Sequence, residues 1–191
     1  ESLLDELCGV YDLKGGLVVP SGSADEKLLA RLIISQAALY IEKLLSKVTR
    51  IGLGWGDTIG RLVDKLKGHP SVESEIGYVC PIIGSAPNDI KWYQTNELAR
   101  AFAEKTGFSP HYLHAPAFPV SLENKKLFEN TIEYQEILKC WRELEMVILG
   151  VGTYPSVPDQ ATAARFGNLL REKKAVGMIA TYYFNRDGKT I

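Results

Sequence analysis

Short apolar segments rich in β-branched residues alternate with longer segments of helical periodicity along the chain of 191 residues. The helical pattern is clearest over 25–47, where apolar residues recur at every third or fourth position. We expect strands near Val18, Ile51, Tyr78, Leu113, Ile148 and Ile179, and helices over 25–47, 58–66, 96–105, 123–130, 132–143 and 159–173. This alternation predicts one α/β domain with a mostly parallel sheet, helices on both of its faces and a Rossmann-like architecture.

The composition narrows the class of protein further. The net charge of −1 removes the basic face that nucleic-acid binding by this segment would require. The three cysteines are far apart in the sequence and predict neither a disulfide framework nor a zinc site. No apolar run approaches the roughly 20 residues of a membrane span. We therefore expect a cytoplasmic protein with no contact to a membrane.

Three glycines stand at alternate positions in the segment IGLGWGDT, residues 51–58. Glycine lets the backbone approach an anion closely, and the helix expected to follow would present the positive end of its dipole. The candidate ligand-binding residues of this segment are Gly54, Trp55, Gly56, Asp57 and Thr58. The same spacing also suits any strand that turns tightly into a helix, so a purely structural role stays open. The segment lacks the spacing of a dinucleotide-binding fingerprint and the Gly-Lys-Ser/Thr of a P-loop.

Two further strand ends also carry glycine. Because parallel strands direct their carboxyl ends to one edge of the sheet, these ends are expected to converge on the same site. They add Gly84, Ser85, Gly152 and Thr153 to the candidate ligand-binding residues. Arg165, in the helix expected to follow, could reach a second anionic group.

Several of these residues have more than one interpretation. Asp57 either faces the ligand or caps the helix that follows, and Trp55 is either a packing residue or a stacking surface. Residues 91–93 either cover a ligand or form a plain surface loop. His111 and His114 would lie on opposite faces of a strand, which argues against a metal site. No cofactor and no compact set of catalytic residues is expected.

Several segments together resemble the SorC-type sugar-binding domain of bacterial transcriptional regulators. GLGWGDTI is similar to that family's G-x-G-W-G-x-T signature, and LKGGLVVP, YLHAPAF and VILGVGTY resemble its other characteristic stretches in the same order. AVGMIATYYFNRDGKTI is similar to its V-G-D-I-x-G-x-F-F-D-x-x-G segment, with Met178, Thr181 and Asn185 as departures. The resemblance covers the whole chain.

The resemblance implies a fold related to ribose-phosphate isomerase and glucosamine-phosphate deaminase, used for sensing rather than for catalysis. It implies a phosphorylated sugar as ligand, a homodimer or homotetramer, and contact with DNA only through a helix-turn-helix domain absent from this sequence. It also implies that the effector domain over 1–191 is incomplete at its C-terminal end, which would leave an apolar edge or face bare. A sugar-phosphate isomerase or deaminase is the alternative.

Overall fold

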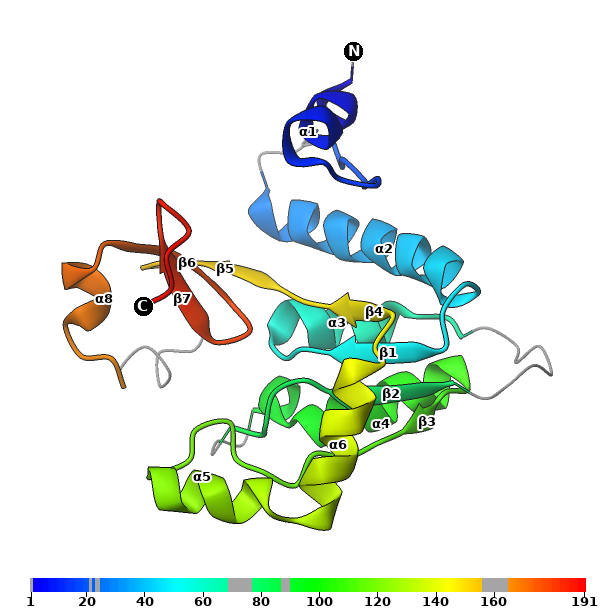
Figure 1. Ribbon diagram of the computed structural model, residues 1–191. Helices are drawn as coiled ribbons and strands as arrows, with labels where there is room; N and C mark the ends of the chain where they lie inside the picture. The colour runs from blue at the N-terminus through cyan, green and yellow to red at the C-terminus, as the bar shows by residue number, and fades with distance from the viewer. Residues whose placement is uncertain (1, 21, 23–24, 69–76, 87–89, 156–164) are drawn as a thin grey trace.

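The computed structural model describes residues 2–20, 22, 25–68, 77–86, 90–155 and 165–191. Its centre is a four-stranded sheet in the order β3-β2-β1-β4, in which every pairing is parallel (Figure 1). The strands are β1 Arg50–Leu53, β2 Tyr78–Pro81, β3 Ser109–Pro110 and β4 Met146–Ile148. Ile51 of β1 lies opposite Val79 of β2 and Met146 of β4. The predicted parallel sheet is therefore confirmed.

Helices cover both faces of this sheet, as the sequence predicts. On one face, α2 (Glu26–Leu45), α3 (Asp57–Lys65) and α4 (Thr95–Thr106) share an apolar core with β1 and β2. On the other face lies α6 (Ile132–Arg142), which follows α5 (Leu122–Glu129). The Trp141 indole N–H of α6 donates to the Pro81 carbonyl at 2.8 Å, and this bond fixes the helix against β2.

The C-terminal segment forms a second sheet that the sequence analysis did not separate from the first. The strands β5 (Val151–Thr153), β6 (Ala175–Ile179) and β7 (Tyr182–Asn185) pair antiparallel, beside α8 (Leu169–Glu172). The strand expected near Ile179 exists, but its expected place in the parallel sheet is wrong. Only Ala180 and Thr181 separate β6 from β7, and a parallel crossover needs a dozen or more residues.

Other expected elements also differ. No strand forms at Val18, which is exposed and which no strand among the described residues approaches to supply ladder hydrogen bonds. The strand expected near Leu113 ends earlier, at Pro110. A helix that was not expected, α1, spans Leu3–Tyr11, and η1 is a short 3-10 helix over Lys91–Tyr93. Of the helix expected over 159–173, residues 159–164 lie outside the described part.

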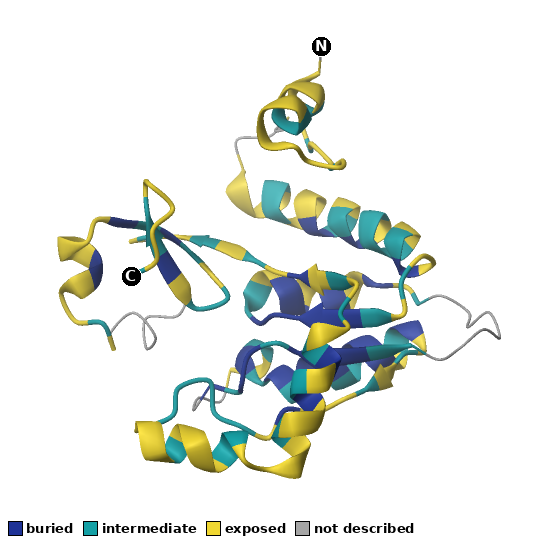
Figure 2. Ribbon diagram, viewed as in Figure 1, coloured by how far each residue is buried: buried dark blue, intermediate teal, exposed yellow. Residues whose placement is uncertain are grey.

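The β4 strand lies at the edge of the main sheet and is buried on one face only. Met146 and Ile148 join the core, whereas Val147 between them is exposed, as are Leu149 and Val151 beyond the end of β4. Figure 2 shows these exposed stretches in yellow along the ribbon from β4 to β5. An apolar run such as residues 146–149 does not by itself reveal that one face of the strand has no cover. None of the helices in the described residues combines the length and the apolar character of a membrane span.

Candidate ligand-binding site

The segment 51–58 runs from β1 into α3 and forms backbone hydrogen bonds to two neighbouring elements, β4 and η1. The Gly54 N–H donates to the Ile148 carbonyl at 3.0 Å, and the Gly56 N–H donates to the Trp92 carbonyl at 2.9 Å. Gly56 caps α3 with φ at 111°, a conformation that favours glycine. The structural role that the sequence left open, a tight turn from strand to helix, is therefore present. The backbone N–H groups of Gly54 and Gly56 bond to carbonyls within the protein and do not face an anion.

The N-terminus of α3 leaves other backbone donors for a ligand. The first helical hydrogen bond runs from the Gly60 N–H to the Gly56 carbonyl, so the N–H groups of Asp57, Thr58 and Ile59 have no partner within the helix. Within the described part of the chain, no side chain caps this end of the helix. Thr58 is exposed beside these groups, which places its hydroxyl at the positive end of the helix dipole.

One of the two interpretations of Asp57 was that it caps α3. The structure contradicts this interpretation, because no side-chain cap bond is present among the described residues. Asp57 is the first residue of the helix, and its carboxylate forms an ion pair with the Arg61 guanidinium at 2.9 Å, one turn further along. Both side chains are about half exposed. The pair partly offsets the negative charge that Asp57 brings to the N-terminus.

Trp55 is a packing residue. It is 8% exposed, and its ring centroid lies 5.2 Å from that of Tyr93 and 6.3 Å from that of Phe118. Trp55 points into the core at the start of the candidate site, which leaves little of its ring for a ligand.

The segment 91–93 is not a plain surface loop but the 3-10 helix η1. Tyr93 is buried, and Trp92 packs on α3 at Gly60. Lys91 lies over the Trp92 ring and 4.0 Å from the Asp64 carboxylate. η1 is thus docked on α3 behind the glycine segment.

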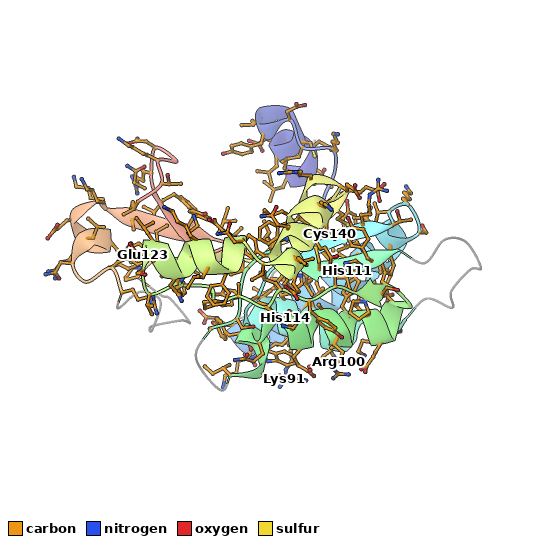
Figure 3. All side chains as sticks on the ribbon, turned by 60° about the horizontal axis from the view of Figure 1, so that its bottom comes forward. Lys91, Arg100, His111, His114, Glu123 and Cys140 are labelled. Atoms are coloured by element: carbon orange, nitrogen blue, oxygen red, sulfur yellow. The ribbon has the colours of Figure 1, made fainter. Side chains whose placement is uncertain are left out.

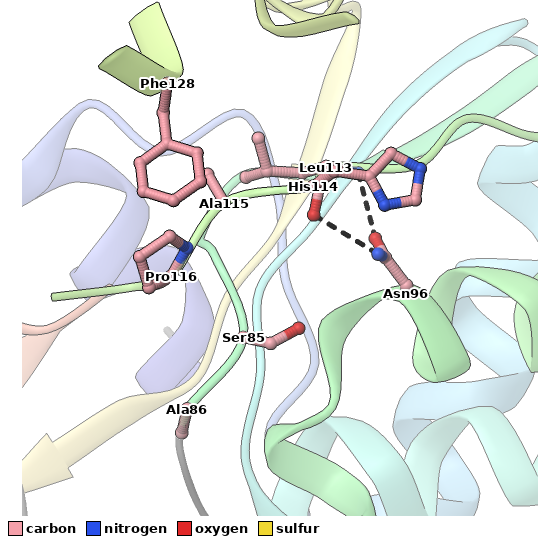
Figure 4. Close-up of a pocket in the computed structure, with 8 residues that line it drawn as sticks. All are labelled: Ser85, Ala86, Asn96, Leu113, His114, Ala115, Pro116 and Phe128. Atoms are coloured by element: carbon pink, nitrogen blue, oxygen red, sulfur yellow. Dashed lines mark hydrogen bonds between the residues drawn. The ribbon is translucent and has the colours of Figure 1, made fainter. Parts of the chain in front are cut away.

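Gly84 and Ser85 lie where the chain leaves β2, against the extended segment that follows β3. A Cβ atom at Gly84 would come within 2.4 Å of the Ala115 carbonyl oxygen, so this glycine serves a crossing of two backbones. The Ser85 hydroxyl is 3.2 Å from that of buried Thr95. A cavity of about 410 Å³ opens beside Ser85 and is lined by Ser85, Ala86, Asn96, residues 113–116 and Phe128 (Figure 4).

Asn96 is a residue of this region that the sequence analysis missed. Its side-chain amide donates to the Leu113 carbonyl at 3.2 Å and accepts from the Leu113 N–H at 2.9 Å (Figure 4). The amide therefore takes the place of a further strand residue and holds the segment after β3. Nothing in the local sequence could reveal this, because the two partners are joined only by the tertiary fold.

Gly152 and Thr153 lie within β5, opposite Met178 and Gly177, and not in a loop at the end of β4. The residue at the exit of β4 is Gly150, whose added Cβ would lie 4.0 Å from Ile59 of α3. Arg165 is exposed, with its guanidinium carbon 4.5 Å from the centroid of the Phe118 ring. The fold thus brings the exits of β1 and β4 together and places Arg165 on an aromatic ring that contacts Trp55.

The titratable groups of the other sheet face make no metal site among the described residues. His111 lies beside Cys140, with Nδ1 3.4 Å from Sγ, while His114 lies farther along the same segment (Figure 3). Burial raises the pKa of the Cys80 thiol to about 12 and also raises the pKa of Cys140. Both thiols therefore stay protonated and act as apolar packing groups.

The three departures from the family segment all fall in the β6–β7 hairpin. Met178 packs with Tyr183 in the small core of the second sheet. Asn185 accepts from the backbone N–H groups of Asp187 and Lys189, each at 3.0 Å, so its side-chain oxygen is committed to the turn. Thr181 lies at φ 71° in the turn between the strands, where a β-branched residue is strained.

These features define an α/β ligand-binding domain whose candidate site lies at the carboxyl edge of a parallel sheet. Residues 2–191 match the family described as "Putative sugar-binding domain", and the chain belongs to this family. The resemblance to the SorC-type sugar-binding domain is thereby confirmed.

Similar proteins are bacterial transcriptional regulators. The chain is 24% identical over 188 residues to the sorbitol operon regulator of Klebsiella pneumoniae, an alignment that covers 93% of this chain and 58% of that protein. The full-length crystal structure of that regulator, SorC, superposes with a TM-score of 0.82 at 23% identity, over 99% of this chain and 61% of the other. A DeoR family transcriptional regulator from Listeria monocytogenes gives a TM-score of 0.85 at 23% identity, over 98% and 74% of the two chains. The chain is accordingly classed with sugar-binding domains and not with enzymes.

Proposed function

We propose that this chain is the effector-binding domain of a bacterial transcriptional regulator and that it senses a phosphorylated sugar. The observation that carries the proposal is the N-terminus of α3, where three backbone N–H groups and the Thr58 hydroxyl lie at the carboxyl edge of the parallel sheet. Family membership supports a sugar as the ligand, and the similar regulators support a role in transcription.

In this proposal the phosphate binds at the N–H groups of Asp57, Thr58 and Ile59. Arg165 binds a second anionic or hydroxyl group, because its exposed guanidinium lies on Phe118, the ring that also contacts Trp55. Gly54 and Gly84 let neighbouring backbone segments approach closely enough to shape the site, and Gly56 supplies the positive φ at the start of α3. Gly152 and Thr153 support it indirectly, since they hold the second sheet next to the exit of β4.

Sensing requires a ligand that binds two states of the regulator with unequal affinity. We propose that the sugar phosphate orders the loops around α3 and that a helix-turn-helix domain outside this sequence reads the change. A regulator that binds operators with two-fold symmetry must itself be a dimer or tetramer. We place this regulator in the cytoplasm. The bare edge of β4 fits the expectation that a further segment of the effector domain covers it.

The experiment is a thermal-shift series with sugar phosphates, their unphosphorylated parent sugars and inorganic phosphate. A sugar phosphate at 100 times its dissociation constant should stabilise the chain by about 2.7 kcal/mol. Thr58→Ala should weaken binding by about 1.5–3 kcal/mol, because it removes a hydroxyl bonded to a charged group. Thr190→Ala, an exposed threonine in the C-terminal segment, is the matched control and should leave binding unchanged.

Two results would overturn the proposal. Equal shifts with the parent sugars would show that the site does not select phosphate. Consumption of the sugar phosphate during incubation would favour the alternative, a sugar-phosphate isomerase or deaminase.

A further inference from the structure

The short helix η1 is bonded to both of the strand exits that carry candidate ligand-binding residues. The Trp92 carbonyl accepts the Gly56 N–H at 2.9 Å, at the exit of β1. The carbonyl of the next residue, Tyr93, accepts the Ala86 N–H at 3.2 Å, at the exit of β2. Two successive peptide groups therefore tie the two exits to a single turn of backbone.

The side chains of η1 hold this turn in place. Trp92 lies on the backbone of α3 at Gly60, where the ring leaves no room for a Cβ atom. Tyr93 is 7% exposed, and its ring centroid lies 5.2 Å from that of Trp55 in the glycine segment. Close packing and edge-to-face stacking restrict both side chains to one arrangement. A shift of η1 would therefore require α3 or Trp55 to move with it.

The exit of β2 connects η1 to the cavity of about 410 Å³. Ser85, which lines the cavity, directly precedes Ala86 in the chain. The Ser85 N–H donates to the Ala115 carbonyl at 3.2 Å, and the Ser85 carbonyl accepts the Ala117 N–H at 3.0 Å. One wall of the cavity is thus attached to η1 through the exit of β2, and the donors at the N-terminus of α3 are attached to it through the exit of β1.

We propose that η1 couples the two exits and that Trp92 and Tyr93 are positioning residues for ligand binding. Of the described residues, those that line the cavity do not include Trp92 or Tyr93, and neither residue belongs to α3. They act through Gly56 and Ala86, whose N–H groups their carbonyls hold. Only the ligand rests on the proposed function, because the coupling of the exits is a property of the unliganded chain.

The first test needs no ligand and measures the hydrogen exchange of single backbone N–H groups by NMR. Gly60→Ala displaces the Trp92 ring, because an added Cβ atom at residue 60 would overlap it. The Gly56 N–H should exchange about tenfold faster, since its acceptor moves with the ring. The Ala86 N–H should accelerate with it, although its acceptor is Tyr93. An unchanged rate at Ala86 would overturn the proposal, because the two exits would then move independently.

A matched control separates positioning from a general loss of stability. Ile137→Val shortens a buried side chain of α6, in a core cluster on the other face of the sheet that does not include η1. In this control the Gly56 and Ala86 N–H groups should accelerate no more than the Val79 N–H in β2. In Gly60→Ala they should accelerate several-fold more than the Val79 N–H. Equal acceleration at all three positions in Gly60→Ala would mean that the variant only loosens the whole fold, and it would overturn the proposal.

The second test measures binding by isothermal titration calorimetry, with glucose 6-phosphate, glucose and inorganic phosphate as probes. Gly60→Ala should weaken the binding of glucose 6-phosphate about tenfold, as expected for the loss of one hydrogen bond to a charged group. Ile137→Val should leave the affinity unchanged. Equal affinity in the wild type and in Gly60→Ala would overturn the positioning role. A wild type that binds none of the probes would count against the proposed function, while the exchange rates would still decide whether η1 couples the two exits.

Discussion

Trp92 lies directly on the backbone of α3 at Gly60. A Cβ atom added at Gly60 would come within 2.1 Å of Trp92 Cδ2, so only glycine fits under this ring. The Trp92 carbonyl also accepts the Gly56 N–H at 2.9 Å. Trp92 therefore fixes both the N-cap residue Gly56 and the helix backbone at Gly60. Through these two contacts it positions the backbone N–H groups at the N-terminus of α3.

Replacing Gly60 by alanine should destabilise the fold, although the same change inside an exposed helix gains up to about 1 kcal/mol. The added methyl group must displace Trp92, and overpacking of this kind costs about 1–3 kcal/mol. Urea denaturation measures the free energy of unfolding. In the background Trp92→Ala the effect of Gly60→Ala should change sign, and additive effects of the two substitutions would contradict the contact.

Asp57→Asn should raise the affinity for a sugar phosphate several-fold. The substitution removes a negative charge beside the proposed phosphate and frees the Arg61 guanidinium from its ion pair. Isothermal titration calorimetry measures the change, with Asp64→Asn near the other end of α3 as the control. A collapse of affinity would instead show that Asp57 itself binds the sugar hydroxyls.

Thr181→Gly should stabilise the chain by about 1 kcal/mol. Ala180 and Thr181 both have positive φ in a two-residue hairpin turn, a conformation in which glycine at the second position is favoured. The melting temperature should rise by roughly 2–4 °C for a domain of this size. Thr153→Gly, within β5, should lower it, and a fall with Thr181→Gly would show that the turn is not strained.

Glu145 should make the stability depend on pH in the acid range. Its carboxylate accepts from the backbone N–H groups of Thr49 and Arg50 at 2.7 and 3.0 Å, which together with the ion pair to Arg50 lowers the pKa of Glu145. A lowered pKa in the folded state gives stability that is present above the unfolded value of about 4.3 and is lost as the pH falls through the folded pKa. In Glu145→Gln the free energy of unfolding should therefore fall less than in the wild type as the pH is lowered below about 5. Urea denaturation at a series of pH values measures it. Glu133→Gln, an exposed glutamate of α6, should not change it.

The resemblance and the local patterns indicated which segments form the candidate site but not the contacts that their side chains make. The turn from β1 into α3 could be predicted, because glycine spacing and the helical periodicity after it are local properties. The roles of Asp57 and Trp92 could not, since an ion pair to Arg61 and a contact to Gly60 depend on how the elements pack. Asn96 was missed for the same reason: its partner Leu113 is distant in sequence.

The sequence by itself determined the class of fold, the alternation of strands and helices, and the family. Hydrophobic periodicity and glycine-bearing motifs are local properties that can be recognised without the tertiary structure. Only the tertiary structure decided that Ile179 belongs to a separate antiparallel sheet and that Gly152 and Thr153 are strand residues. It also decided which apolar residues stay exposed, as Leu32 and Val151 do. An apolar side chain carries the same transfer free energy wherever it stands, and burial follows from the surface that the rest of the fold brings against it.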